Sequence, residues 1–83
     1  LNGNSLHIFS YGNTVTLQYS EVPQGDITIA VYDLLGATIA IEENVVLQSN
    51  THRFNLSNIA DGYYVVRVTD AKGAQAKQLF ITQ

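Results

Sequence analysis

The sequence contains no cysteine, no methionine and no tryptophan, and it has a single proline. Without cysteine the chain can form neither a disulfide framework nor a thiolate metal site. Only 13% of the residues are charged, well below the roughly 25% that is usual, and the formal net charge is −3. The few basic residues are scattered along the sequence and form no cluster for nucleic acid. They are Arg53, Arg67, Lys72 and Lys77.

Long hydrophobic runs are also missing, because no apolar stretch approaches the ~20 residues that a membrane helix needs. A length of 83 residues allows one domain and no more. The first residue is Leu1 and not methionine. We therefore expect a single domain, residues 1–83, cut from a longer polypeptide.

What the sequence does contain is apolar residues in alternation with polar ones. The clearest segments are Ile27–Asp33 and Gly62–Asp70, both rich in β-branched and aromatic residues. In the second segment we place Arg67 on the outer face, because a charge costs least in water. The residues predicted to lie in the core are Ile29, Val31, Tyr64, Val66 and Val68.

Turn residues separate the alternating segments at roughly even spacing, and no segment has helical periodicity. This pattern predicts an all-β fold, an immunoglobulin-like β-sandwich of about seven antiparallel strands. The predicted strands are 6–10, 14–20, 27–33, 37–42, 51–56, 62–70 and 75–82, with 43–49 left between strand and loop. Gly36 and Gly62 are predicted to need a positive φ.

A tyrosine at the start of segment 62–70 fits a device of immunoglobulin-like domains, the tyrosine corner. Its hydroxyl bonds back to the backbone of the preceding crossover. Tyr64 would form this corner, or Tyr63 if the strand has the opposite phase. The alternative is that both are ordinary sheet aromatics.

No constellation of residues points to catalysis or to a metal ion. The two histidines, His7 and His52, lie in predicted strands, and no Gly-x-Ser-x-Gly elbow is present to offer a nucleophile. Each of the aspartates lies at a strand end or in a turn, where the side chain normally bonds backbone groups. These residues are Asp26, Asp33, Asp61 and Asp70. We expect no enzyme activity, no metal and no cofactor.

Three stretches together resemble a known family: Val31–Gly36, Leu56–Val68 and Lys77–Ile81. Their order and spacing are similar to the type A C-terminal sorting domain of the type IX (Por) secretion system of Bacteroidetes, over residues 6 to 83. The middle stretch is the most specific, with a leucine, a short turn that ends in glycine, and then Tyr-x-Val-x-Val.

The resemblance implies that residues 1–83 are a single β-sandwich domain from the C-terminus of a longer protein, and that this domain is a sorting and export signal recognised by an outer-membrane translocon. It also implies contact with a shuttle or a sortase-like protease, and attachment of the parent protein to surface lipopolysaccharide. The localisation would be the periplasm in transit and then the outer-membrane surface or the medium. Translocon recognition would involve the last strand, whose end we expect to be free, at Lys77, Leu79, Phe80 and Ile81. The matching motif turns are at Asp33, Gly36, Asp61, Gly62 and Tyr64.

Two departures from the family pattern leave cleavage open. Phe9–Asn13 stands where many members have Tyr-Pro-Asn-Pro, and the chain ends in Thr82-Gln83 instead of a basic residue. The domain would belong either to a cargo protein with a divergent start or to a secretion component that keeps it. The rival functions are an immunoglobulin-like adhesion or carbohydrate-binding module, and an inert spacer. Carbohydrate binding by a sandwich usually needs a row of exposed aromatic residues, and the sequence supports it only weakly, because it has tyrosines but no tryptophan.

Overall fold

The computed structural model describes residues 5–83, so the first four residues of the predicted domain lie outside the described part. Residues 5–83 form seven strands and no helix, and the predicted strand order is confirmed. The ambiguous segment 43–49 contributes its first three residues to the fourth strand. The strands are β1 (Leu6–Tyr11), β2 (Thr14–Tyr19), β3 (Ile27–Tyr32), β4 (Thr38–Val45), β5 (Thr51–Asn55), β6 (Gly62–Asp70) and β7 (Gly73–Ile81).

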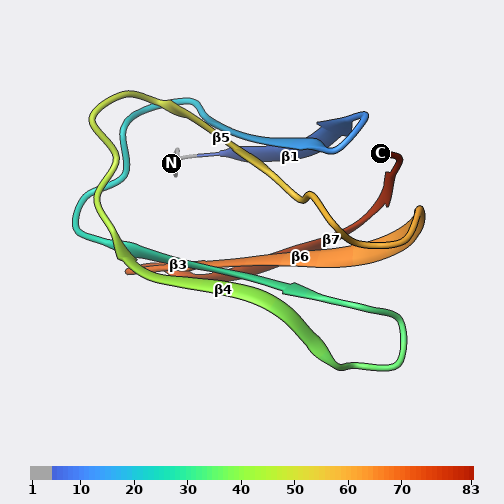
Figure 1. Cartoon of the computed structure of the whole chain (residues 1–83). Helices are drawn as coiled ribbons and strands as arrows, with labels where there is room; N and C mark the ends of the chain where they lie inside the picture. Colours follow the sequence, from blue (N-terminus) through green and yellow to red (C-terminus); the bar gives the residue numbers. More distant parts are fainter. Residues whose placement is uncertain (1–4) are drawn as a thin grey trace.

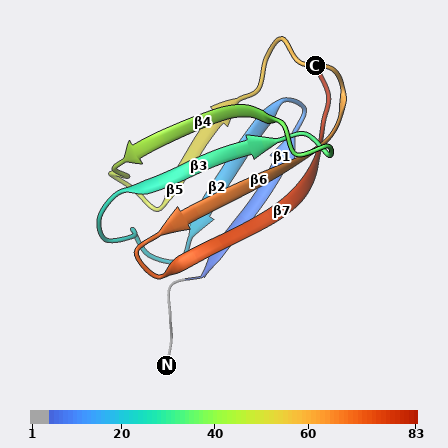
Figure 2. The same cartoon turned by 90° about the horizontal axis from the view of Figure 1, so that it is seen from below.

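The strands form two sheets that face each other (Figure 1). One sheet has the order β1-β2-β5, the other has the order β4-β3-β6-β7, and every pairing is antiparallel. Figure 2 shows the four-stranded sheet in front of the three-stranded one. The predicted immunoglobulin-like sandwich is therefore confirmed.

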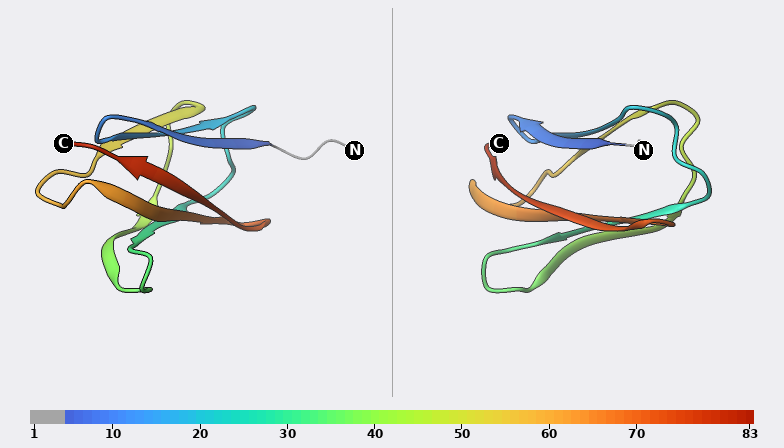
Figure 3. Two further views of the ribbon diagram at one scale, coloured as in Figure 1. Left: turned by 90° about the vertical axis from the view of Figure 1, so that its right-hand side faces the viewer. Right: turned by 180° about the vertical axis from the view of Figure 1, so that it is seen from behind.

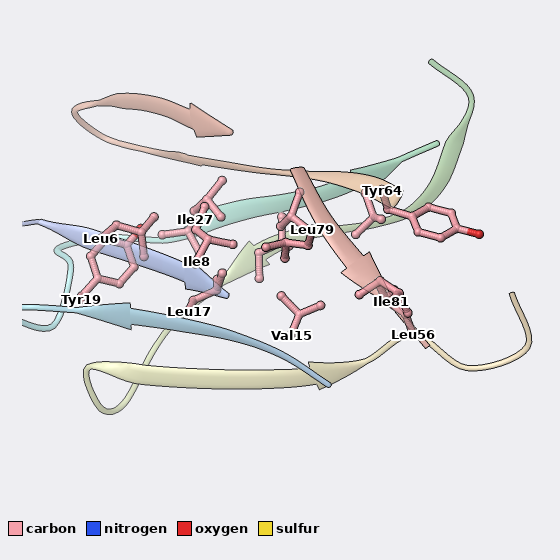
Figure 4. Packing of buried hydrophobic residues seen from close by; sticks show 14 of the residues in the cluster. Leu6, Ile8, Val15, Leu17, Tyr19, Ile27, Leu56, Tyr64, Leu79 and Ile81 are labelled. Atoms are coloured by element: carbon pink, nitrogen blue, oxygen red, sulfur yellow. The ribbon is translucent and has the colours of Figure 1, made fainter. Parts of the chain in front are cut away.

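The core lies between the two sheets and takes alternate residues from each inner face (Figure 4). All five residues predicted for it are buried, and Val66 is fully excluded from solvent. Tyr63 and Arg67 are exposed on the outer face of the same strand. The phase of β6 is therefore the predicted one.

The turn glycines have the predicted backbone conformation. Gly36 has a φ of +92° in the loop between β3 and β4, where Asp33 Oδ1 accepts hydrogen bonds from the N–H groups of Leu35 and Ala37, both 2.9 Å. Gly62 has a φ of +158°, which is positive but close to extended backbone. Of the two, Gly36 makes the stronger demand for glycine.

The tyrosine corner is present and it uses Tyr64. The Tyr64 hydroxyl donates a 2.7 Å hydrogen bond to the carbonyl of Ala60 in the preceding crossover. Tyr63 instead packs its exposed ring against Phe80 of β7. The corner fixes how the chain crosses from the three-stranded sheet to the start of β6.

Candidate functional site: the edge strand β7

Strand β7 lies at one edge of the four-stranded sheet and pairs only with β6. Its residues differ in exposure along its length. Every residue from Gly73 to Gln78 is exposed, whereas Leu79 and Ile81 are buried in the core. The strand is therefore anchored at its C-terminal end and open to solvent over its first two thirds.

The four residues predicted for recognition divide into two pairs. Leu79 and Ile81 point into the sandwich (Figure 4) and are 6% and 0% exposed. Phe80 is 48% exposed and Lys77 is also exposed. A partner of the folded domain can reach Lys77 and Phe80, while Leu79 and Ile81 hold the strand in place.

Lys77 lies on the inner face of the sheet, directly opposite the buried Val66, yet it is exposed. Gln75 shares this face and donates a 2.8 Å hydrogen bond from Nε2 to the carbonyl of Leu6 in β1. The inner face of β7 thus leaves the core before Leu79, as the phase of Lys77 predicts. The ammonium group of Lys77 is free to meet solvent or a partner.

The end of β7 is not free, which corrects the expectation from the sequence. β1 belongs to the other sheet, but the C-terminal end of β7 approaches it (Figure 3). The Ser10 hydroxyl donates a 3.0 Å hydrogen bond to the carbonyl of Phe80, and the Thr82 N–H donates a 3.1 Å bond to the carbonyl of Gly12. These bonds cap the backbone of β7 at its C-terminal end.

Gln83 adds three further hydrogen bonds at the same end. Its N–H donates to Asp61 Oδ1 at 2.8 Å, and its Nε2 donates to the carbonyl of Leu56 at 2.8 Å. Its Oε1 accepts a 3.3 Å bond from Asn13 Nδ2. Asp61 therefore bonds a distant backbone group and not its own turn. Peeling the last residues away would break all of these contacts.

The free edge of β7 presents unpaired backbone groups further back along the strand. In a strand the N–H and C=O of one residue point to the same side, and this side alternates from residue to residue. Because the carbonyl of Phe80 points to the edge next to β1, the backbone groups of Ala74, Ala76 and Gln78 point to that edge as well. No hydrogen bond joins these three residues to another strand within residues 5–83.

Three of the four basic residues lie on the hairpin of β6 and β7, although they looked scattered in the sequence. Arg67 is on β6, Lys72 is in the turn, and Lys77 is on β7. Within residues 5–83 none of them forms an ion pair. The carboxylate nearest in sequence, Asp70, accepts bonds from the Tyr19 hydroxyl and from the Lys72 N–H. This hairpin is a basic part of an acidic domain.

Two polar contacts elsewhere were not predicted from the sequence. The Tyr19 hydroxyl donates a 3.1 Å hydrogen bond to Asp70 Oδ2 and so ties β2 to the end of β6. Burial, with a smaller effect from the charge of Asp70, raises the pKa of Tyr19 above its ordinary value. On the other side of the sandwich, Nε2 of His52 is buried without a hydrogen bond, 3.9 Å from Glu42 Oε1. Each pair joins side chains of two strands that are not hydrogen-bonded to each other, which explains why alternation within single strands gave no signal for them.

Within residues 5–83 no group of three or more histidine or carboxylate side chains is placed to hold a metal ion. The same part of the chain has no helix that is long and apolar enough to cross a membrane.

Solved structures with a similar fold come from different bacteria. A DUF3244 family protein from Bacteroides vulgatus, described as an immunoglobulin-like β-sandwich, superposes with a TM-score of 0.74 and 19% identity, over 90% of this chain and 81% of that protein. CopC from Methylosinus trichosporium OB3b superposes with a TM-score of 0.60 and 15% identity, over 96% of this chain and 85% of that one. At these identities the likeness shows the fold alone. No curated protein matches the sequence.

The family model for the secretion system C-terminal sorting domain matches residues 11–82, which is nearly the whole chain. The match includes the motif turns at Asp33 and Gly62 and the whole of β7. The chain therefore belongs to the family of C-terminal sorting domains of the type IX secretion system.

Proposed function

We propose that this domain directs its parent protein to the type IX outer-membrane translocon, and that the translocon recognises it through β7. The domain acts as a folded recognition module and not as an enzyme. The family match supports the role as a sorting signal. The role of β7 is supported by its position in the fold. It is an exposed edge strand with unpaired backbone groups, in a domain of this family.

Edge strands suit recognition because a partner can extend the sheet by main-chain hydrogen bonds and choose its target by side-chain contacts. On β7 the accessible side chains include Lys77 and Phe80, two of the four positions that match the family's tail. Leu79 and Ile81 take part indirectly, since their burial keeps Phe80 facing outward. The motif residues Asp33, Gly36, Asp61, Gly62 and Tyr64 serve the turns and the corner that position β6 and β7.

In this proposal the parent protein passes through the periplasm and reaches the outer-membrane surface or the medium. On this route a shuttle or a sortase-like protease binds the domain. It is either cleaved, with the cargo joined to surface lipopolysaccharide, or retained in a secretion component. The domain occupies the C-terminus of the parent protein in both cases.

The exposed aromatic residues give little support to a carbohydrate-binding module. Tyr63 and Phe80 form the exposed aromatic pair on β6 and β7, with ring centroids 5.0 Å apart. Their planes meet at 63°, so the two rings offer no flat platform for a sugar ring. We therefore do not propose carbohydrate binding as a second function.

The experiment that tests the sorting function compares two fusions to one periplasmic reporter in a host that has type IX secretion. In one fusion the domain follows the reporter, and in the other it precedes the reporter. Both proteins have the same composition and the same folded domain. Surface display is measured by antibody labelling of intact cells, and secretion is measured in the medium.

A terminal sorting signal exports the reporter only from the C-terminal position. Equal display from both positions would contradict sorting and would favour a spacer or an adhesion module. Retention of both fusions in the periplasm would also contradict it. Truncation of 79–83 is a poor test, because removal of Leu79 and Ile81 would empty part of the core.

A further inference from the structure

We propose that the first two thirds of β7 binds an acidic, extended segment of the translocon by strand addition. This inference rests on the proposed sorting function and names the chemistry of the partner. It follows from three features of β7: where its backbone is unpaired, where its free edge ends, and which charges flank it.

The unpaired backbone groups define where an added strand can bind. Ala74, Ala76 and Gln78 direct their N–H and C=O groups to the free edge of β7. Alanine at two of these positions keeps the edge open, because a methyl group does not obstruct an approaching backbone. Each of the three residues can exchange a pair of hydrogen bonds with an opposite residue, as in any ladder.

The free edge ends before Phe80, so the added strand is short. Ser10 already bonds the carbonyl of Phe80, and the carbonyl of Gly12 accepts the N–H of Thr82. An added strand therefore pairs along 74–78 and meets β1 at Phe80. The ring of Phe80, 48% exposed, lies at this end and can pack against an apolar side chain of the partner.

The charges beside the free edge are positive on both faces of the sheet. On the outer face Arg67 lies directly opposite Ala76, and on the inner face Lys77 belongs to β7 itself. Neighbouring strands lie about 4.8 Å apart, so an added strand would lie about 10 Å from β6. The side chain of Arg67 and that of a glutamate on the added strand are together long enough to meet over the methyl group of Ala76. An acidic residue on either face of the added strand therefore meets a cation.

The same charges make a second copy of this domain a poor occupant. Pairing of two β7 edges would bring Arg67 and Lys77 of one copy beside those of the other. Like charges on neighbouring strands repel each other and destabilise the pairing. Although the domain as a whole carries a net charge of −3, Arg67 and Lys77 make this edge locally basic, and it favours an acidic partner segment over a basic one.

The experiment measures binding of this domain to the purified translocon of the host in detergent, by biolayer interferometry at low and high salt. Two variants change the site. Arg67→Glu with Lys77→Glu reverses the charges, and Ala76→Pro removes an edge N–H that β6 does not use. Proline is tolerated at such an edge position. The matched controls are Arg53→Glu, an exposed arginine of β5, and Ala76→Ser, which keeps the N–H.

We expect both site variants to bind at least tenfold more weakly than the original domain. Both control variants should bind within twofold of the original domain. High salt should weaken binding of the original domain. Circular dichroism melts confirm that the variants are folded. If the original domain binds and the charge-reversed variant binds equally well, the acidic strand is wrong and the sorting function still stands. If the original domain neither binds the translocon nor exports the reporter, the sorting function fails and this inference fails with it.

Discussion

The Tyr64 hydroxyl lies 2.7 Å from the carbonyl oxygen of Ala60, four residues upstream, and donates a hydrogen bond to it. This bond joins the crossover between the sheets to the start of β6, the strand that pairs with β7. The ring of Tyr64 is buried while its oxygen points away from the core toward the loop (Figure 4). The corner therefore contributes both apolar packing and a directed polar contact.

Removal of this hydroxyl tests the corner. We expect Tyr64→Phe to lower the free energy of unfolding by about 1 to 2 kcal/mol, because the carbonyl of Ala60 loses its partner and the ring remains. Tyr63→Phe is the matched control and should change it little, since Tyr63 is exposed. Urea denaturation measures both. Equal effects of the two substitutions would show that the corner contributes nothing specific.

The phase of β6 predicts different costs for neighbouring valines. Val66 is 0% exposed, so Val66→Ala leaves a cavity and should lower stability by about 1 to 4 kcal/mol. Val65 lies on the outer face and is half-buried, so Val65→Ala should cost clearly less. Thermal melts compare the two variants. A larger loss at Val65 would mean that the strand faces the other way.

The glycine turns differ in how strongly they need glycine. Gly36 has a φ of +92°, far from the conformations that L residues prefer, and Gly36→Ala should cost about 1 kcal/mol or more. Gly62→Ala should cost less, because its φ of +158° needs only a small rotation to become extended and no atom lies within 4 Å of the added methyl group. The same denaturation series measures both. A greater loss at Gly62 would contradict this order.

The bond between Tyr19 and Asp70 makes stability depend on pH in the alkaline range. Burial and Asp70 raise the pKa of Tyr19 in the folded state above the value near 10 of the unfolded chain. The folded state therefore holds the proton more tightly, and this contribution is complete below about pH 10 and lost as the pH rises further. Above that pH we expect stability to fall by up to about 1.4 kcal/mol per pH unit.

Urea denaturation between pH 8 and pH 11 measures this dependence. Tyr19→Phe should be less stable than the original domain at pH 8, and its stability should fall less steeply above pH 10. Parallel curves for the two proteins would show that Tyr19 does not carry the alkaline transition.

The strands could be predicted from the sequence because each inner face needs an apolar residue at every second position. The end of β4 could not be predicted in this way, because its backbone is irregular there. Asn44 has a φ of +59°, and the register with β3 shifts between Ile27 and Ile29. The sequence also left Tyr63 and Tyr64 as alternatives for the corner. Only the packing of β6 against the other sheet decides between them.

The candidate site was predicted in part. The family's tail pointed to β7, and the phase of Lys77 indicated that the inner face leaves the core there. The bonds that close the end of β7 were missed, because Ser10 and Asn13 find their partners, Phe80 and Gln83, 70 residues away in the sequence. The grouping of Arg67, Lys72 and Lys77 was missed for a related reason, since it depends on how the hairpin pairs.

The most direct measurement of the central claim is the export rate of a C-terminal reporter fusion that carries changes only in the exposed residues of β7. Phe80→Ala combined with Lys77→Ala removes both accessible side chains of the family's tail. Phe9→Ala combined with Arg53→Ala is the matched control, because it removes an exposed aromatic and an exposed cation from the three-stranded sheet. Melting temperatures confirm that both fusions carry a folded domain. Recognition through β7 predicts that the first pair of substitutions slows export at least fivefold while the control pair leaves the export rate unchanged. Export of both fusions at the original rate would contradict the claim.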